Sequence, residues 1–463
     1  MEPNFVRRRA VDVPVDAVEA WHRRPGALHR LLPPWEPARV VGTPGPPEPG
    51  SRVELRVGRP PLDLPWVAEH RALEEGRGFR DVQVRGPFAR WEHEHRFRSR
   101  SGGAGTLLED RIEFELPGGA PVQRLLEGAV LRRLERGFRY RHRTVRGDLR
   151  THLGRRSGER WRVAITGSSG LVGSELVAFL RSGGHEVLRV VRGAAAGEDE
   201  IGWDPASGLR DPGRAEGLDA VVHLAAEPLT GLWTEGKKRS IARSRKQGTR
   251  SLVDSLCSLE SPPETLISTS AVGYYGDRGD ERLTEESGKG EGFLAGVCRE
   301  WEEAALGAEE AGIRVVRVRL GVVLSGRGGA LPVMVPPFWL ALGASLGDGR
   351  QWMSWVSLDD VLDVIHFALD RESVRGAVNV VAPGAVRHGE FTRTLGRVLS
   401  RPVPFRVPEP LLRAVPGELV EEMFLASQRV EPEALTSAGF SFRHPDLEGA
   451  LRHQLGRLPP DVG

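Results

Sequence analysis

Apolar residues alternate with polar ones along short runs through the first 150 residues, which is the pattern of half-buried β-strands. The clearest run is Arg90–Arg98, where one face carries four ring-bearing side chains: Trp91, His93, His95 and Phe97. Further strands are predicted, with turn residues between them, at Phe5–Val13, Ala38–Val41, Arg52–Val57, Pro65–Leu73, Phe79–Arg85 and Thr106–Leu116. Helices are predicted at 14–22 and around 122–138. We therefore expect residues 1–150 to form an α+β helix-grip domain, in which a curved antiparallel sheet grips a helix around an internal cavity.

A different pattern begins at Trp161, where buried strands alternate with helical stretches. The strands are predicted at 162–165, 185–191, 219–224, 265–270, 314–320 and 377–381. Strands separated by helices predict a Rossmann-like α/β domain with a doubly wound parallel sheet over 161–385. The basic, glycine-containing segment 151–160 is expected to be a linker. Residues 386–463 are mostly helical with proline breaks, and are expected to form a small C-terminal, substrate-side lobe together with 326–352.

The first strand of the second domain runs into a glycine-rich turn: Thr166-Gly167-Ser168-Ser169-Gly170-Leu171-Val172-Gly173. Three glycines let the chain turn sharply and approach a ligand, while the N-terminus of the following helix offers N–H groups to a pyrophosphate. The second strand ends at Arg192, where an acidic residue would favour NAD. A guanidinium suits a 2′-phosphate, so NADP(H) is the predicted cofactor. The alternative is that Arg192 is one more surface residue of an arginine-rich chain.

Composition narrows the class of protein without specifying a reaction. The chain has 463 residues, 39% of them apolar and 28% charged, which indicates two or three globular domains. No run approaches the ~20 apolar residues of a membrane span, and no signal peptide is predicted. Two cysteines cannot form a disulfide framework, which favours a reducing cytoplasm. The net charge of +2 offers no global field for nucleic acid.

The first domain resembles the START-like polyketide cyclase/dehydrase and lipid-transport superfamily. The resemblance rests on the element order and on Trp21-His22-x-x-Pro25-Gly26-Ala27, Pro33-Pro34-Trp35-Glu36 and Gly86-Pro87-Phe88-Ala89-Arg90-Trp91. It implies a pocket for an apolar ligand. His93 and His95 share one strand face and could bind a metal, but no third ligand is evident from the sequence. They are expected to line the pocket or to have their hydrogen bonds satisfied in the interior of the domain, and no metal is predicted.

The second domain resembles the extended, epimerase-like branch of the short-chain dehydrogenase/reductase superfamily. Besides the glycine loop, the resemblance rests on His223-Leu224-Ala225-Ala226, Ser268-Thr269-Ser270-Ala271-Val272-Gly273-Tyr274-Tyr275-Gly276 and Trp355-Val356-Ser357-Leu358-Asp359-Asp360-Val361. Further matching runs are Trp233-Thr234-Glu235, Ser244-Arg245-x-Gln247-Gly248-Thr249, Gly349-x-Gln351-Trp352 and Ala426-Ser427-Gln428-Arg429-Val430. The resemblance implies cofactor contacts at Leu224, Ala225, Ala226 and Arg245. It implies a small-molecule substrate, such as a sugar nucleotide, near Glu227, Trp233, Gln351 and Trp352.

The chain departs from this superfamily at the acid/base pair. The family's Tyr-x-x-x-Lys stacks a phenol and an ammonium on one helix, but no such spacing occurs here, and the two positions read Cys298 and Glu302. The remaining catalytic candidates are Ser270, Tyr274, Tyr275 and Cys298; packing is the alternative role for both tyrosines, and a buried filler is the alternative role for the cysteine. Two hypotheses stay open: an NADP(H)-dependent oxidoreductase or epimerase with an unusual acid/base, and a non-catalytic NADP(H)-binding redox sensor.

Overall fold

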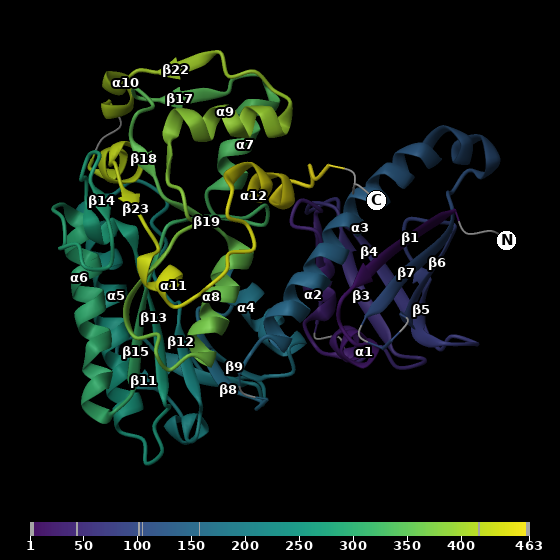
Figure 1. Cartoon of the computed structure of the whole chain (residues 1–463), viewed down its shortest axis with the longest axis horizontal. Coiled ribbons are helices and arrows are strands. Elements are labelled where there is room, and N and C mark those ends of the chain that lie inside the picture. The colour runs from purple at the N-terminus through teal and green to yellow at the C-terminus, as the bar shows by residue number, and fades with distance from the viewer. Residues whose placement is uncertain are drawn as a thin grey trace. The chain divides into compact units, whose positions relative to one another are not determined.

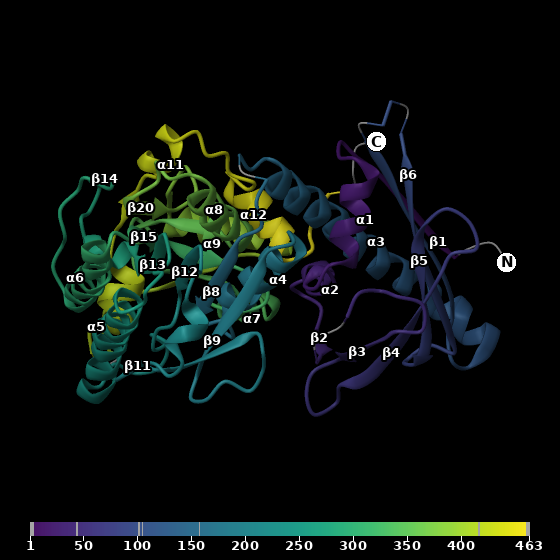
Figure 2. The ribbon, with the colours of Figure 1, turned by 90° about the horizontal axis from the view of Figure 1, so that it is seen from below.

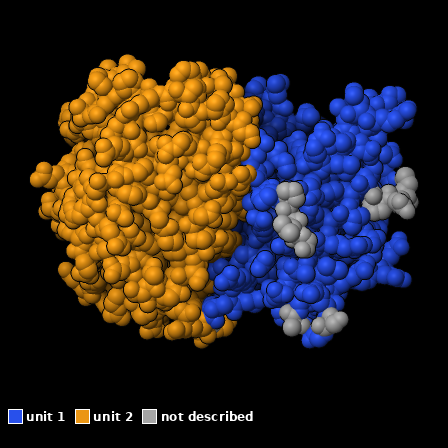
Figure 3. All heavy atoms as spheres, turned by 45° about the horizontal axis from the view of Figure 1, so that its top comes forward, with its two compact units in different colours: residues 1–155, 178–185, 455–463 blue, residues 156–177, 186–454 orange. Residues whose placement is uncertain are grey.

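The computed structural model describes residues 4–42, 45–100, 102–103, 105–156, 158–414 and 417–459. The chain divides into two compact units (Figure 3). Unit 1 comprises residues 1–155 together with 178–185 and 455–463, and unit 2 comprises residues 156–177 and 186–454.

Unit 1 is built on an antiparallel sheet with the strand order β1-β7-β6-β5-β4-β3-β2 (Figures 1 and 2). The strands are β1 (Phe5–Val11), β2 (Ala38–Val41), β3 (Arg52–Val57), β4 (Leu64–Arg71), β5 (Arg77–Arg85), β6 (Arg90–Ser99) and β7 (Thr106–Glu115). Two short helices, α1 (Val15–Arg23) and α2 (Ala27–Leu31), follow β1, and the long helix α3 (Gly119–Leu153) follows β7. Trp21, Phe97 and Val145 belong to a core cluster to which α1, β6 and α3 contribute. This architecture confirms the predicted helix-grip domain.

Helix α3 is longer than the sequence pattern suggested. It ends at Leu153, so the first three residues of the expected linker, 151–153, are helical. The last turns are held by packing, because Val145 and Leu149 are buried in the unit 1 core. Tertiary burial therefore extends a helix through a segment whose charge and glycine content indicated a connection.

Unit 2 contains an eight-stranded sheet with the order β11-β10-β9-β8-β12-β13-β15-β20 (Figure 1). Its strands are β8 (Arg162–Thr166), β9 (Glu186–Arg192), β10 (Glu200–Asp204), β11 (Gly208–Leu209), β12 (Ala220–His223), β13 (Thr265–Ala271), β15 (Arg314–Leu320) and β20 (Gly376–Val380). All neighbouring pairs are parallel except β10 with β11. The sequence pattern had not indicated the edge strands β10 and β11.

Helices lie on both sides of this sheet, which confirms the predicted doubly wound fold. In Figure 1, α5 (Glu235–Cys257) and α6 (Phe293–Leu306) lie on one side, and α4 (Leu171–Ser182) and α8 (Leu358–Asp370) lie on the other. Apolar side chains such as Ile201, Val221 and Leu266 fill the space between strands and helices. Short elements continue two strands at their carboxyl ends: the 3-10 helix η2 (Val272–Tyr275) after β13 and the strand β16 (Val322–Leu324) after β15. The 3-10 helix η3 (Gly307–Ala311) connects α6 to the start of β15.

The C-terminal segments form a smaller lobe beyond the strand ends, seen at the top of Figure 1. Strand β17 (Ala344–Leu346) pairs with β22 (Phe405–Val407), and β18 (Trp352–Met353) pairs with β21 (Val386–Arg387). The remaining elements of unit 2 are η1 (Pro212–Ala215), β14 (Arg282–Leu283), α7 (Leu331–Trp339), β19 (Trp355–Ser357), α9 (His388–Leu399), α10 (Glu409–Arg413), η4 (Glu421–Leu425), β23 (Arg429–Val430), α11 (Glu433–Ser437) and α12 (Leu447–Gln454). Within the described ranges, no helix has both the length and the apolar character needed to cross a bilayer.

Candidate functional site: a dinucleotide loop beside an altered acid/base pair

The glycine loop of unit 2 connects β8 directly to the N-terminus of α4. Gly167 has a φ of +64°, which favours glycine, and the N–H of Gly170 donates to the Gly167 carbonyl at 2.9 Å. A Cβ at Gly173 would lie 2.1 Å from the Gly167 carbonyl oxygen. The loop therefore packs against the helix start with no room for a side chain. This is the close backbone geometry that a dinucleotide pyrophosphate requires.

Replacing Gly173 with alanine is expected to abolish dinucleotide binding and to lower the free energy of unfolding by about 1–3 kcal/mol, because a fixed carbonyl blocks the new methyl group. Gly296→Ala in α6 is a matched control, since a Cβ there meets nothing within 4 Å. That variant should be neutral or stabilised by up to about 1 kcal/mol. Fluorescence titration with NADPH and denaturant melts measure both quantities. Normal binding by Gly173→Ala would place the cofactor elsewhere.

A buried hydroxyl joins the glycine loop to the turn after β12. Thr166 Oγ1 accepts the N–H groups of Leu224 (3.0 Å) and Ala225 (3.1 Å), and lies 2.8 Å from His223 Nδ1. Burial lowers the pKa of His223 to about 4, so the imidazole is neutral and accepts the Thr166 proton through Nδ1. Its Nε2–H then donates to Thr249 (2.9 Å). Thr166, His223 and Thr249 thus shape the turn expected beside the adenine ribose, although sequence reasoning had assigned them no role.

The two arginines predicted to contact the cofactor differ in their surroundings. Arg192, at the end of β9, is exposed, and its guanidinium has no ion pair or hydrogen bond within the described residues. Arg245 is buried above the Trp301 ring and donates to the Glu227 carbonyl at 3.0 Å. Glu227 itself pairs with Lys237 at 2.7 Å. Arg192 is therefore free to meet a phosphate, whereas Arg245 holds the main chain of the turn after β12.

The position of the family's catalytic lysine is occupied by a buried ion cluster. Glu302 forms a bidentate pair with Arg319, with both N···O distances 2.8 Å, and Arg317 adds a third contact at 3.1 Å. Ser270 donates its hydroxyl to the same carboxylate at 2.7 Å. Parallel pairing of β13 with β15 places Ser270 directly opposite Arg319. Burial opposes the charge on Arg319, but the hydrogen bonds that Arg319 donates to Glu302 outweigh burial and raise the pKa of the guanidinium. The Ser270 hydroxyl is thus engaged inside the fold.

The other three catalytic candidates also have defined environments. Burial raises the pKa of the Cys298 thiol to about 11, so the residue is protonated at neutral pH. The Tyr275 hydroxyl is buried, donates to Asn379 at 2.7 Å and accepts from Arg319 at 2.9 Å. Tyr274 is half-buried, its ring lies 3.6 Å from the Arg319 guanidinium, and its hydroxyl has no hydrogen-bond partner among the described residues. Of the four, Tyr274 alone has a polar group left for a ligand.

A cavity of about 820 Å³ opens beside η2, at the carboxyl end of β13. It carries basic groups at Arg278, Lys289 and Arg413, and acidic ones at Glu291, Glu421 and Glu422. The four residues predicted to hold substrate do not line it: Glu227, Trp233, Gln351 and Trp352. Trp352 donates to Asp280 at 2.8 Å, and the guanidinium groups of Arg387 and Arg429 both lie over its ring. The Gln351 amide donates to the Phe424 carbonyl at 3.0 Å. Gln351 and Trp352 thus have partners within the protein that short sequence runs could not reveal.

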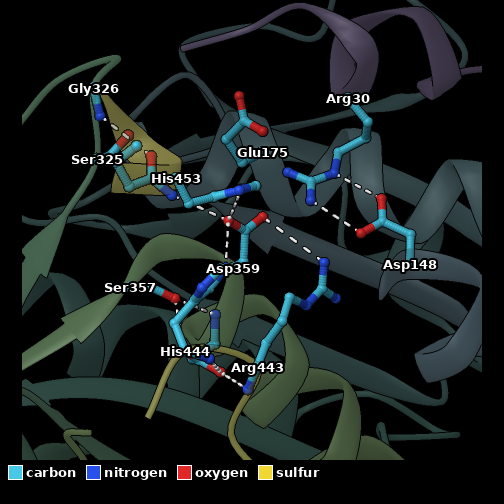
Figure 4. A network of polar contacts seen from close by, with 12 residues as sticks. Arg30, Asp148, Glu175, Ser325, Gly326, Ser357, Asp359, Arg443, His444 and His453 are labelled. Carbon is cyan, nitrogen blue, oxygen red and sulfur yellow. Dashed lines mark hydrogen bonds and ion pairs between the residues drawn. The ribbon is translucent and has the colours of Figure 1, made fainter. Parts of the chain in front are cut away.

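A second polar network holds the C-terminal segment of unit 2 to α8 (Figure 4). Asp359 accepts a hydrogen bond from Gln454 at 3.0 Å and lies 3.2 Å from His453 Nε2. Arg443 pairs with Asp363 at 2.6 Å and comes within 4.0 Å of Asp359. A guanidinium and an amide are thus the hydrogen-bond and ion-pair partners of these carboxylates. We interpret the network as one that stabilises the fold.

Unit 1 contains its own cavity, of about 470 Å³, between the sheet and α3. Most of its wall is apolar, with contributions from Val53, Phe79, Trp91 and Phe138. The predicted pair His93 and His95 lies in this wall beside Asp81, together with the Arg141 guanidinium. The sequence had not revealed the carboxylate partners of these histidines, because those partners lie on neighbouring strands.

Three parts of the chain match known protein families. Residues 11–143 match the polyketide cyclase / dehydrase and lipid transport family, and residues 163–381 match the NAD dependent epimerase/dehydratase family. Residues 407–454 match a domain of unknown function. These matches confirm the resemblances of both main domains and show that the C-terminal lobe is a recognised domain.

Relatives extend the similarity over longer stretches. An epimerase family protein from Mycobacterium bovis is 44% identical over 296 residues, which are 64% of this chain and 98% of that one. A solved structure described as a nucleoside-diphosphate sugar epimerase from Corynebacterium glutamicum is 34% identical, with a TM-score of 0.81 over 98% of this chain and 90% of that chain. The human epimerase family protein SDR39U1, solved with NADPH, is 32% identical, with a TM-score of 0.59 over 64% of this chain and 100% of that chain.

Proposed function

Because the chain belongs to the NAD dependent epimerase/dehydratase family, we propose that unit 2 is an NADP(H)-dependent oxidoreductase or epimerase-like enzyme. The supporting observation is the glycine loop at α4, whose backbone leaves no room for a side chain at Gly167 or Gly173, together with the exposed Arg192, which forms no ion pair with any described residue. Gly167, Ser168, Ser169, Gly170, Leu171, Val172 and Gly173 would hold the pyrophosphate, and Leu224, Ala225 and Ala226 would lie along the adenosine. When bound, the dinucleotide supplies hydride transfer. The human relative was solved with NADPH, which agrees with the choice of cofactor.

The preference for NADPH over NADH is expected to depend on Arg192. A charge-assisted contact with a 2′-phosphate contributes roughly 1.5–3 kcal/mol, or about 10- to 150-fold in Kd. Arg192→Ala should weaken the binding of NADPH by that factor and leave the affinity for NADH unchanged. Arg189→Ala is a matched control on the same strand, since that arginine is already paired with Asp199 and Glu200. Equal affinity of the unaltered protein for both cofactors would contradict the assignment.

The proton donor of this enzyme is proposed to be Tyr274. Cys298 and Glu302 offer no donor, because one is a high-pKa thiol and the other is ion-paired with Arg319. Among the described residues the Tyr274 hydroxyl has no hydrogen-bond partner, and the Arg319 guanidinium lies 3.6 Å from the centre of its ring. Tyr274 itself does not line the cavity beside η2, but its neighbour Gly273 does. This cavity carries both charge signs, so the proposed substrate is a polar small molecule with a charged group, such as a sugar nucleotide.

Adjacent tyrosines provide a matched test of this role. Tyr274→Phe should lower the rate of NADPH oxidation by roughly 10²–10⁴-fold, which is the usual contribution of a positioned proton donor. Tyr275→Phe should mainly lower thermal stability, because Asn379 and Arg319 lose a buried partner. The measurement is stopped-flow oxidation of bound NADPH with a panel of nucleotide sugars. Unchanged turnover in Tyr274→Phe would remove it from the mechanism.

The second candidate function is a non-catalytic NADP(H) sensor. It is favoured by the ion cluster that occupies the lysine position and by the engagement of Ser270 with Glu302. A sensor would bind NADPH with normal affinity and turn over no substrate, and Tyr274→Phe would then have no kinetic phenotype. For unit 1 we propose binding of an apolar ligand, since its cavity wall is mostly apolar and the domain matches a lipid-transport family.

A further inference from the structure

The inner face of the unit 1 sheet carries a compact cluster of imidazoles and carboxylates. Antiparallel pairing places Asp81 of β5 directly opposite His93 of β6, and His95 directly opposite Asp110 of β7. One potential ligand atom from each of Asp81, His93 and His95 lies within 4.8 Å of the corresponding atoms of the other two. All three side chains line the 470 Å³ cavity. We propose that Asp81, His93 and His95 bind a first-row transition-metal dication, Zn²⁺ or Fe²⁺, in this cavity.

The supporting carboxylate is already positioned. Asp110 is buried and lies 2.9 Å from His93 Nε2 and 3.0 Å from His95 Nδ1. If each of these ring nitrogens donates to Asp110, lone pairs remain on His93 Nδ1 and His95 Nε2, and the latter is 3.5 Å from an Asp81 oxygen. His70 similarly orients Asp81, with a contact of 2.5 Å to its other oxygen. Metal-binding histidines are typically held in this way, through the ring nitrogen that faces away from the ion.

The charge of the cluster also suits a dication. Asp81 lies in the cavity wall and Asp110 contacts both histidines, and within the described ranges no arginine or lysine comes within ion-pair distance of either carboxylate, although Arg141 in the same wall attracts both at longer range. Among the described residues, imidazoles are the close partners of both carboxylates: His70 and His95 at Asp81, and His93, His95 and His142 at Asp110. A metal would be bound by the neutral forms of its ligand histidines. The Asp359 cluster in Figure 4 differs, because Arg443 already lies beside its carboxylate.

Two imidazoles and one carboxylate leave at least one coordination position open, as in catalytic zinc sites and non-haem iron sites. Bonds of about 2.0–2.2 Å require the three ligand atoms, now within 4.8 Å of one another, to draw together to roughly 3.4 Å. The free position would face the apolar cavity, where Arg141 adds a positive charge. The inferred ligand is therefore an apolar molecule with one oxygen-bearing head group, a carboxylate or a carbonyl, that the metal binds or polarises.

The test uses the full-length protein, free of any histidine tag and purified without chelators. Elemental analysis is expected to find close to one Zn or Fe per chain. After chelation, one equivalent of Co²⁺ should produce the intense visible absorption of a site with low coordination number. An unaltered chain that carries no metal and gives no Co²⁺ spectrum would overturn the proposal, whatever the variants do.

Variants then locate the ion. Asp81→Asn, His93→Gln and His95→Gln should each weaken Co²⁺ binding by at least roughly 100-fold, and Asp110→Asn by roughly 10- to 100-fold through loss of orientation. His29→Gln is the control, since this half-buried histidine of α2 does not line the cavity. NADPH titration of each variant shows that unit 2 is intact. Retention of a one-equivalent spectrum in well-folded His93→Gln and His95→Gln proteins would place the ion elsewhere and refute the site.

Discussion

Installing the family's acid/base pair, as Cys298→Tyr with Glu302→Lys, is expected to lower the free energy of unfolding by about 3–5 kcal/mol and to add no activity. Glu302 and Arg319 side chains are only 4% and 3% exposed, and Arg317 contacts the same carboxylate. Replacing the carboxylate with an ammonium buries like charges together. It also removes the acceptor of the Ser270 hydroxyl. Denaturant melts and NADPH oxidation measure the two effects.

The neighbouring residue supplies the control for this prediction. Glu303→Lys makes the same charge change one position further along α6, at an exposed site, and should alter stability by no more than about 0.5 kcal/mol. Adding Arg319→Met to the double variant should recover part of the lost stability, because it removes one of the repelling cations. If the double variant is as stable as the unaltered protein, the ion cluster does not exclude a lysine at position 302. The absence of lysine there would then need another explanation.

Breaking the Arg30–Asp148 pair should lower the stability of unit 1 by about 3–5 kcal/mol, because the loss of either side chain takes a bidentate contact away from a buried charge. The Arg30 side chain is 1% exposed and that of Asp148 is fully buried, and they form a bidentate contact of 2.9 and 3.0 Å (Figure 4). The pair fastens α2 to α3. The measurement is amide hydrogen exchange in these two helices, carried out on the Arg30→Leu and Asp148→Asn variants. It reports the loss of stability in unit 1 separately from the stability of unit 2.

The double variant Arg30→Leu with Asp148→Leu makes this prediction specific to charge. It should be more stable than either single variant, since two apolar side chains leave no buried ion behind. The exposed pair Arg52–Glu69 is the control, and Arg52→Leu should change stability by less than about 1 kcal/mol. Single variants that behave like Arg52→Leu would show that the buried pair contributes only as much as a surface one.

Local patterns in the sequence determined most of the elements and indicated the proposed cofactor site. Strict alternation at 90–98 predicts β6 because successive side chains on a strand point to opposite faces. This pattern can be recognised from the residues of that strand alone. The glycine loop is similarly local, since Gly167 and Gly173 are six residues apart and contact each other directly. Arg192 could be proposed as a cofactor contact for the same reason. It ends β9, and the strand before it along the chain, β8, ends at the glycine loop. Such features depend on spacing along one or two adjacent elements.

The partners of each polar side chain were decided only by the tertiary structure. From the sequence, Glu302 in the lysine position indicates only the loss of a catalytic residue. The structure shows that β15 places Arg319 beside it, although Arg319 is 17 residues further along the chain. His93 and His95 read as a pair without a third ligand until β5 and β7 bring Asp81 and Asp110 against them. The energy of a buried charge depends on which groups surround it in space, and strand register sets those neighbours. Alternation predicts which face a side chain takes, but not which residue of the next strand it meets.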